Sequence, residues 1–527
     1  MRKYILPLLF VLIYGFLSAA LGAATHDDEY VVVLGPSSIE WNPLYTYSTT
    51  EAQLYTAVYE GLVVYDPRTL QPRPGVASRW SISEDKRSYT FHLRKDARYQ
   101  DGSPVTAQDF RETWELMLRQ GNNSPFSFLL EPIQGAADFR LGRTRDANTL
   151  GIETPDDHTL VITLEKPAAH FLSILCHQSL VPLPQGHRTA ESWNGSDELP
   201  SNGPYRIAEY TDEHIVFQKN DQYWDRARVL LPSIRVLFRE DPLKNSQEFN
   251  YGSVQWIMDS FDAEAIRIPG SLQIHPQFST HYYFFRSAEP PWDDPSIRKA
   301  IALALPLAQL RSEDVYFVPT ARLVPEIPGY PEPETLGTAQ NASAARALLA
   351  EAGYPLGRGL PPLRVLQPEG QESQRIGTLI KESLEDTLEL EVILETLPYA
   401  QFQAAQRDGS FTLSTISWVG DFADPLTFLN MWVTDNPVNI GGYANPEYEQ
   451  LLDQASLLEG EERFTKLSEA ESLLLTQAAL IPISHSPSIN VIDLEETEGW
   501  YPNALDIHPF KNMAFATQRA PYNVVRF

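Results

Sequence analysis

Residues 76–110 read VASRWSISEDKRSYTFHLRKDARYQDGSPVTAQDF, and this stretch decides the fold. Side chains alternate in character over residues 80–82 and 88–93, on either side of the polar turn 84–87, which predicts a β-hairpin. A second turn at 101–104 follows. Thr106, with Asp109 three residues later, matches a capping box for a helix that reaches Leu118.

The rest of the chain alternates in the same way between short strands and amphipathic helices. Residues 30–34 form a buried strand before Gly35-Pro36, and residues 280–285 form an aromatic strand before a helix that Asp294 caps. The pattern predicts a mixed α/β fold. Further helices are expected over 344–352, 376–388, 446–457 and 461–475, and further strands over 361–365, 390–397 and 480–483.

Composition and charge limit the classes of function. The chain has 527 residues, of which 43% are hydrophobic and 21% charged, as in a folded chain of about two to four domains. Its formal net charge is -28. Binding to nucleic acid requires Lys and Arg to replace the counterions of the phosphates, so an acidic chain of this kind is not expected to bind nucleic acid.

The first residues have the features of an export signal. Met1-Arg2-Lys3 is positive, residues 4–17 are mostly apolar, and small residues lead to an expected cleavage site near Ala24. The apolar run is shorter than the roughly 20 residues that span a bilayer, which disfavours an uncleaved anchor. Cys176 is the single cysteine, so no lipoprotein cysteine follows the signal and no intramolecular disulfide can form.

The stretch 76–110 is similar to the family of periplasmic oligopeptide- and dipeptide-binding proteins, the peptide class (family 5) of ABC-transporter solute receptors. Many fixed spacings agree at once in this stretch. Other motifs follow in the family's order and cover nearly the whole mature chain. They are Trp41-Asn42-Pro43-Leu44, Tyr59-Glu60-Gly61-Leu62, Ser201-Asn202-Gly203-Pro204-Tyr205, residues 345–353 and Tyr443-Ala444-Asn445-Pro446-Glu447-Tyr448.

The resemblance implies a two-lobed clamshell with an extra domain in the first lobe. Lobe 1 is expected to contain residues 25–275 and 487–527, with the extra domain at roughly 59–190, and lobe 2 residues 276–486. The resemblance further implies a monomeric periplasmic receptor that encloses short extended peptides between the lobes and delivers them to the permease of an ABC importer. Pairing with the ligand's backbone makes such binding tolerant of the ligand's side chains.

The resemblance also assigns a ligand site. Asp421 falls where the family's aspartate binds the N-terminal ammonium of the peptide; from the residues alone, a turn or helix-cap aspartate is the alternative. Main-chain groups of Ser417, Trp418 and Val419 are expected on one edge of the peptide, and those of Tyr47, Ser48 and Thr49 on the other. The side chains of Trp418, Tyr399 and Tyr282 are candidate walls, although aromatic residues also occupy cores.

The sequence departs from the enteric oligopeptide receptors at several positions of this site. Ser279 and Val419 replace the two half-cystines of a disulfide, and Phe126 replaces a tyrosine that contacts the ligand backbone. Gln406 and Thr415 stand where arginines meet the carboxylate of short peptides, and Arg407 is expected to face another way. The preferred peptide length therefore does not carry over.

Two other classes of function have less support. The sequence has no nucleophile elbow, zinc-protease motif or phosphate-binding loop, so catalysis is not expected. Its histidines show no metal-ligand spacing, and we expect neither a metal nor a cofactor. A receptor of the same fold for another amine-bearing solute or a metal chelate stays open.

Overall fold

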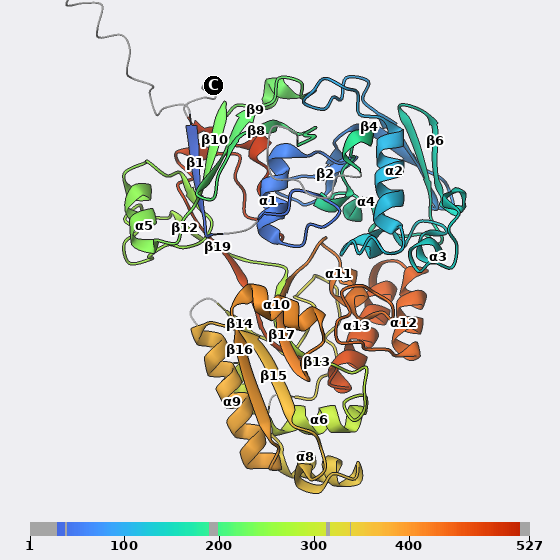
Figure 1. Ribbon diagram of the computed structural model, residues 1–527, viewed down its shortest axis with the longest axis vertical. Helices are drawn as coiled ribbons and strands as arrows, with labels where there is room; N and C mark the ends of the chain where they lie inside the picture. The colour runs from blue at the N-terminus through green and yellow to red at the C-terminus, as the bar shows by residue number, and fades with distance from the viewer. Residues whose placement is uncertain (1–28, 37–38, 189–198, 312–316, 338, 517–527) are drawn as a thin grey trace, which may run out of the picture.

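The computed structural model describes residues 29–36, 39–188, 199–311, 317–337 and 339–516. The expected export signal, residues 1–24, lies outside this part of the chain. Within the described residues, no helix is both long enough and apolar enough to cross a membrane. Figure 1 shows a mixed α/β molecule with an upper and a lower lobe.

A seven-stranded mixed sheet forms one half of the upper lobe. Its central strand β1 pairs in parallel with β10 and β11, while β9 and β19 pair with those neighbours in antiparallel fashion. The strands in sheet order are β12 (Leu272–Pro276), β19 (Pro487–Ile492), β11 (Trp256–Ile257), β1 (Glu29–Leu34), β10 (Ser233–Phe238), β9 (His214–Lys219) and β8 (Tyr205–Tyr210).

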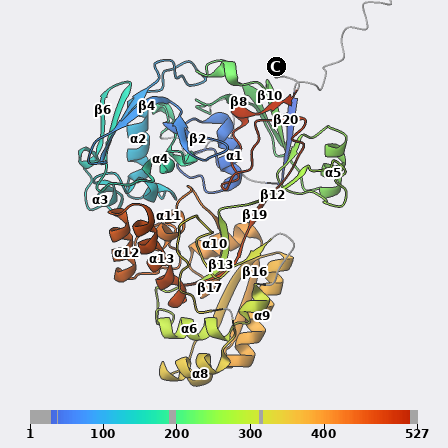
Figure 2. The ribbon, with the colours of Figure 1, turned by 180° about the vertical axis from the view of Figure 1, so that it is seen from behind.

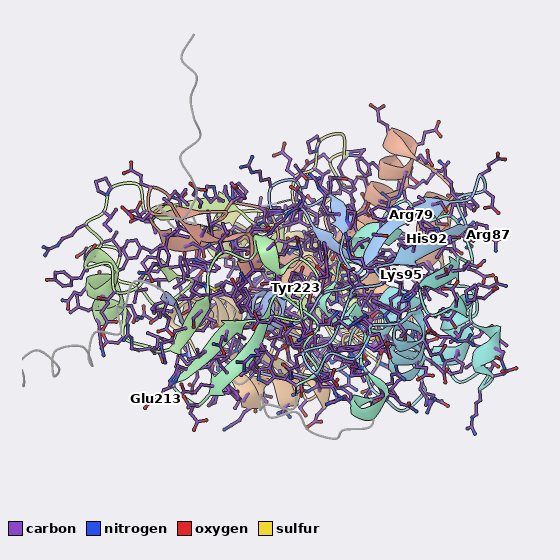
Figure 3. The ribbon with its side chains drawn as sticks, turned by 90° about the horizontal axis from the view of Figure 1, so that it is seen from above. Arg79, Arg87, His92, Lys95, Glu213 and Tyr223 are labelled. Atoms are coloured by element: carbon purple, nitrogen blue, oxygen red, sulfur yellow. The ribbon has the colours of Figure 1, made fainter. Side chains whose placement is uncertain are left out.

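A four-stranded sheet with its own helices forms the other half of the upper lobe. Phe91 on β5 points into the core, whereas Arg79 and His92 face each other across β4 and β5 on the outer face (Figure 3). The capping box of Thr106 and Asp109 is present, and α2 ends at Leu118 as expected. The elements are β4 (Ala77–Ile82), β5 (Ser88–Leu93), β7 (Thr159–Thr163), β6 (Ile152–Asp156), α2 (Ala107–Leu118), α3 (Ala136–Arg140) and α4 (Phe171–Ile174).

Smaller elements complete the upper lobe. They are α1 (Thr49–Val58), α5 (Pro242–Asn250), the strand pairs β2 (Val63–Tyr65) with β3 (Pro72–Pro74) and β20 (Thr497–Glu498) with β21 (Ala514–Phe515), and the 3-10 helices η2 (Ser127–Leu130), η3 (Ala147–Thr149), η4 (Gln178–Leu180), η5 (Gln185–His187), η6 (Arg226–Arg228) and η9 (Phe510–Asn512). The C-terminal segment returns to this lobe, because the amide of Gln53 on α1 exchanges two hydrogen bonds with the backbone of His508.

The lower lobe is built on a six-stranded sheet. Its strands in order are β14 (Val318–Pro319), β18 (Leu480–His485), β13 (Ser279–Phe285), β17 (Leu413–Val419), β15 (Leu363–Pro368) and β16 (Val392–Leu397). The helical elements of this lobe are α6 (Pro295–Ala304), α7 (Leu307–Leu310), α8 (Ala342–Glu351), α9 (Gln371–Leu388), α10 (Tyr399–Arg407), α11 (Leu426–Leu429), α12 (Pro446–Ser456), α13 (Gly460–Thr476), η7 (Pro355–Gly357) and η8 (Asn430–Trp432).

Two short segments join the sheets of the two lobes. Residues 277–278 lie between β12 and β13, and Ser486 lies between β18 and β19. Phe278 is held from both sides: its N–H donates to Ala504 of the upper lobe at 2.7 Å, and its carbonyl accepts from Gly420 of the lower lobe at 2.8 Å. That lobe 2 begins at residue 276, ends at residue 486 and moves as a rigid body stays a prediction.

The lobes touch over a continuous apolar surface. One cluster of buried side chains includes Phe110 and Phe171 of the four-stranded unit together with Phe422 and Trp418 of the lower lobe. Figures 1 and 2 both show α12 and α13 beneath this unit. The structure therefore represents a conformation in which the lobes are closed on each other.

A buried carboxylate in the lower lobe yields a prediction about stability. Glu471 on α13 is fully buried and accepts hydrogen bonds from the N–H groups of Leu323 and Val324 and from the hydroxyl of Tyr330. Burial outweighs these bonds and raises the pKa of Glu471 to about 7. Because the pKa of this carboxyl is higher in the folded than in the unfolded chain, its protonation favours the folded state. This contribution is complete below the ordinary pKa of glutamate and is lost as the pH rises through about 7.

Glu471→Gln imitates the protonated acid. We expect its free energy of unfolding, relative to that of the wild type, to rise by up to about 3 kcal/mol from pH 5 to pH 8. Urea unfolding of both proteins at the two pH values measures this change. Glu382→Gln, at an exposed position of α9, is the control, and its free energy of unfolding relative to the wild type should be the same at both pH values. An equal difference at both pH values would contradict the prediction.

Candidate ligand-binding site

One edge of β17 is open where the site is expected. β13 pairs with the whole of β17, from Leu413 to Val419, whereas β15 pairs with it at Leu413 and Ser414. Among the described strands, none continues the sheet beside residues 416–419. An unpaired strand edge offers N–H and C=O groups to an extended chain. Ser417, Trp418 and Val419, the predicted main-chain partners of a ligand, lie on this segment.

Asp421 follows at the end of this open edge, with its backbone fixed by both lobes. Its N–H donates to the hydroxyl of Thr427 at 2.7 Å. Its carbonyl accepts from the hydroxyl of Tyr65 on β2 at 3.0 Å, and the same hydroxyl lies 3.0 Å from the carbonyl of Ser173. Tyr65 thus ties the upper lobe to the residue predicted to bind an amine.

The carboxylate of Asp421 has few partners in the described part of the chain. Its side chain is 8% exposed, and the contacts of its oxygens are the Thr427 hydroxyl at 3.5 Å and Nε2 of His177 at 3.6 Å. Both distances are at or beyond the limit of a hydrogen bond. A buried carboxylate that lacks a close cation is costly, so this position favours a cationic group of a ligand.

His177 is a site residue that the sequence did not reveal. It lies just before η4, is 3% exposed, and its Nδ1 accepts from the N–H of Ser179 and lies 2.7 Å from the hydroxyl of that residue. Within the described part of the chain, Nε2 has no hydrogen-bond partner, and it faces Asp421. A lone histidine in a sequence gives no sign of a contact with a residue this far along the chain.

Aromatic rings join the predicted site residues across the two lobes. The ring of Tyr47 lies 6.2 Å from that of Phe126 and 6.4 Å from that of Trp418, between ring centroids. Phe126 in turn lies 4.4 Å from the ring of His177. Tyr47, Phe126, Trp418 and Asp421, all assigned through the same resemblance, therefore lie in one group of side chains, with His177 between Phe126 and Asp421.

Tyr47 is confined although water reaches it. Its side chain is 41% exposed, yet burial raises its pKa to about 12, with smaller contributions from Tyr399 and Asp421. The positive charge of Arg407 lowers the pKa of the same hydroxyl. Arg407 is exposed whereas Gln406 beside it is buried, and the expectation that Arg407 faces another way stays a prediction.

The backbone of residues 47–49 is partly engaged within the chain. Ser48 caps α1, which begins at Thr49, and Glu51 completes the capping box. The N–H groups of Tyr47 and Ser48 both donate to the carboxylate of Glu51, at 2.7 and 3.1 Å. The carbonyl of Ser48 accepts from the N–H of Ala52 at 3.1 Å. The prediction that this segment pairs with a ligand is thus left mainly to the carbonyl of Tyr47 and the N–H of Thr49.

The two remaining wall candidates differ in position. Tyr399 begins α10 and is 64% exposed, so its ring is available to a ligand. Tyr282 is 1% exposed, and its hydroxyl points to the sulfur of Met431 at 4.0 Å. It borders a small apolar cavity with Trp432 and Ile416, and its role as a wall stays a prediction.

Four of the positions at which the sequence departs from the enteric receptors, Ser279, Val419, Gln406 and Thr415, are bonded within the lower lobe. Ser279 and Val419 are direct partners in the β13–β17 register, where a disulfide would join the strands. Gln406 donates to the hydroxyl of Ser414 and the carbonyl of Thr415. Neither Gln406 nor Thr415 replaces the positive charge of an arginine. In the described residues, no group of His, Cys, Asp and Glu side chains suited to a metal ion is found.

The two lobes, the open strand edge and the carboxylate between the lobes define a class of binding protein. Residues 71–439 match the family described as "Bacterial extracellular solute-binding proteins, family 5 Middle". The chain belongs to this family of solute-binding receptors.

Two curated relatives and two solved structures show the range of this similarity. The "Probable deoxycholate-binding periplasmic protein YgiS" of Escherichia coli K12 is 29% identical over 87% of each chain. The "Periplasmic oligopeptide-binding protein OppA" of Salmonella typhimurium is 26% identical over 87% of this chain and 86% of that protein. The fold matches Haemophilus influenzae OppA in complex with the peptide RPPGFSPFR, with a TM-score of 0.82, 24% identity and coverage of 93% and 99%.

The second solved structure differs in conformation. The murein tripeptide-binding protein MppA in its unliganded open form matches with a TM-score of 0.64 at 27% identity, with coverage of 93% and 97%. The lower score at similar coverage agrees with the closed contact between the lobes described above.

Proposed function

We propose that this protein captures short peptides between its lobes and binds them by their free N-terminus. The open edge of β17, which ends at the buried Asp421, carries this proposal. An extended peptide has the same ladder of N–H and C=O groups whatever its side chains, and its ammonium supplies the cation that Asp421 lacks. Membership of the family and the similarity to OppA support peptides as the ligand class.

We further propose that the receptor works as a periplasmic monomer, is not an enzyme, and delivers its ligand to the permease of an ABC importer. The family consists of extracellular solute-binding proteins, and the curated relatives above carry periplasmic names. A receptor of this kind needs differential affinity for its closed form rather than a reactive group.

The relative YgiS suggests a different ligand, because its name refers to an anionic bile acid. A buried carboxylate such as Asp421 disfavours a bound anion, which leaves an amine-bearing solute as the better match. Native mass spectrometry of the purified protein tests this choice. A co-purified mass of a peptide, or of another amine, would support the proposal, whereas a bile acid or a metal chelate would contradict it.

Ligand-linked closure is a prediction of the same proposal. We propose that residues 276–486 move as one lobe about residues 277–278 and Ser486, and that a peptide bound to both lobes stabilises the closed form. Small-angle X-ray scattering should give a smaller radius of gyration at saturating peptide than without ligand. Asp421→Asn at the same peptide concentration is the control and should stay open. An unchanged radius for the wild type would exclude this mechanism.

A further inference from the structure

We infer that His177 is a specificity-determining residue that makes capture of the amine depend on pH, because its imidazolium form competes with the ligand's ammonium for Asp421. This inference rests on the proposed function. It starts from one contact: Nε2 of His177, in the upper lobe, lies 3.6 Å from Oδ1 of Asp421, in the lower lobe. Both side chains are more than nine-tenths buried.

The orientation of the imidazole is fixed from its other side. The backbone N–H of Ser179 donates to Nδ1, so a neutral His177 has its proton on Nε2, toward Asp421. The ring also lies against Phe126, at 4.4 Å between centroids, which limits its rotation. His177 therefore presents a neutral donor to the carboxylate in one protonation state and a full positive charge in the other.

The two protonation states have opposite effects on an amine. A neutral imidazole leaves the negative charge of Asp421 uncompensated, and the ligand's ammonium supplies the missing cation. An imidazolium at the same distance neutralises Asp421, so the ammonium would have to be buried against a pair that is already neutral. Burial of a charge without a free partner is strongly unfavourable. Binding of the amine and binding of a proton at His177 are therefore antagonistic.

The tyrosine and cysteine groups around this contact keep their protons over the relevant pH range. Burial raises the pKa of Tyr65, whose hydroxyl touches Asp421, and that of Cys176, which precedes His177. Burial likewise raises the pKa of Tyr47 to about 12. Histidine ordinarily changes its charge between pH 5 and pH 8, where these tyrosine and cysteine groups keep their protons.

The experiment compares binding at pH 7.0 and pH 5.5 by titration calorimetry. The probe is the alanine peptide of two to five residues that binds the wild type tightest, because alanine side chains do not titrate. We expect wild-type affinity to fall several-fold on acidification, because the imidazolium form of His177 neutralises Asp421. Affinity of His177→Gln should change less than twofold, and the N-acetylated peptide should show no such fall with the wild type.

His170→Gln is the matched control. His170 lies on the same segment, is half-buried at the contact between the lobes and stacks on Phe422 at 5.6 Å, and none of its described contacts is with Asp421. The affinity of His170→Gln should fall on acidification as much as that of the wild type. His177→Asn keeps a polar side chain near Ser179. It is used in place of His177→Gln if the melting temperature of that variant lies well below that of the wild type.

Two results would overturn the inference: a wild-type affinity that is independent of pH, or the full wild-type fall in both variants of His177. Failure of the proposed function gives a different result, since the wild type would then bind free and acetylated peptides equally at pH 7.0.

Discussion

Asp421→Asn should weaken the binding of a short alanine peptide with a free N-terminus by hundreds to thousands of times. The substitution keeps the shape of the side chain but removes the charge that a desolvated ammonium requires. Loss of one member of a buried ion pair costs about 3 to 5 kcal/mol, at about 1.4 kcal/mol per tenfold change in affinity. The long contacts of this carboxylate with Thr427 and His177 do not replace such a pair.

Acetylation of the peptide should cause a comparable loss with the wild type. The two losses should not add, because each removes the same pair. Titration calorimetry of wild type and mutant, with free and acetylated peptide at pH 7, measures this cycle. Asp408→Asn, at an exposed aspartate just after α10, is the matched control and should bind like the wild type. If the mutant kept the wild-type preference for the free amine, Asp421 would not be the amine-binding residue.

Elements with a local signal could be predicted closely from the sequence. The capping box of Thr106 and Asp109 and the N-cap Asp294 both stand where expected, because a cap depends on residues within one turn. Helix α9 begins at Gln371, five residues before its expected start at 376, since the polar residues of its first turns carry no apolar periodicity. Strand β15 ends at Pro368 rather than 365, in register with β16.

The site divides between two kinds of information. Asp421, Trp418 and Tyr47 were expected from a family resemblance, and the fold brings them together with Phe126. His177 and Tyr65 were missed, because their roles arise from contacts across the two lobes between residues remote in sequence. The resemblance also placed main-chain groups of Ser417, Trp418 and Val419 beside a ligand, whereas the residues alone do not give the open edge of β17, since it depends on how far β15 extends beside it.

A buried ion pair holds the segment that carries Asp421, and we expect its removal to cause a large loss of stability. The guanidinium of Arg463 on α13 binds both carboxylate oxygens of Asp424, at 2.8 and 2.9 Å. The side chains are 8% and 15% exposed. Removal of Arg463 leaves Asp424 with the N–H of Leu426 as its remaining hydrogen-bond donor among the described contacts.

We expect Arg463→Met to lower the free energy of unfolding by about 3 to 5 kcal/mol, because an unpaired carboxylate stays buried. Urea unfolding should be measured at pH 8, since His170 lies near Asp424, and its protonation at lower pH would partly replace the lost charge. Lys466→Met, one turn along α13, removes a more exposed partner of Glu469 and should cost less than about 1 kcal/mol.

The double variant Asp424→Leu/Arg463→Met separates the charge from the contact. It removes both charges, so most of the stability should return if the unpaired carboxylate is the cause of the loss. An equal loss in the single and double variants would instead assign the effect to the packing of the Arg463 side chain between α11 and α13. A single variant within 1 kcal/mol of the wild type would show that the 421–424 segment is held without this pair.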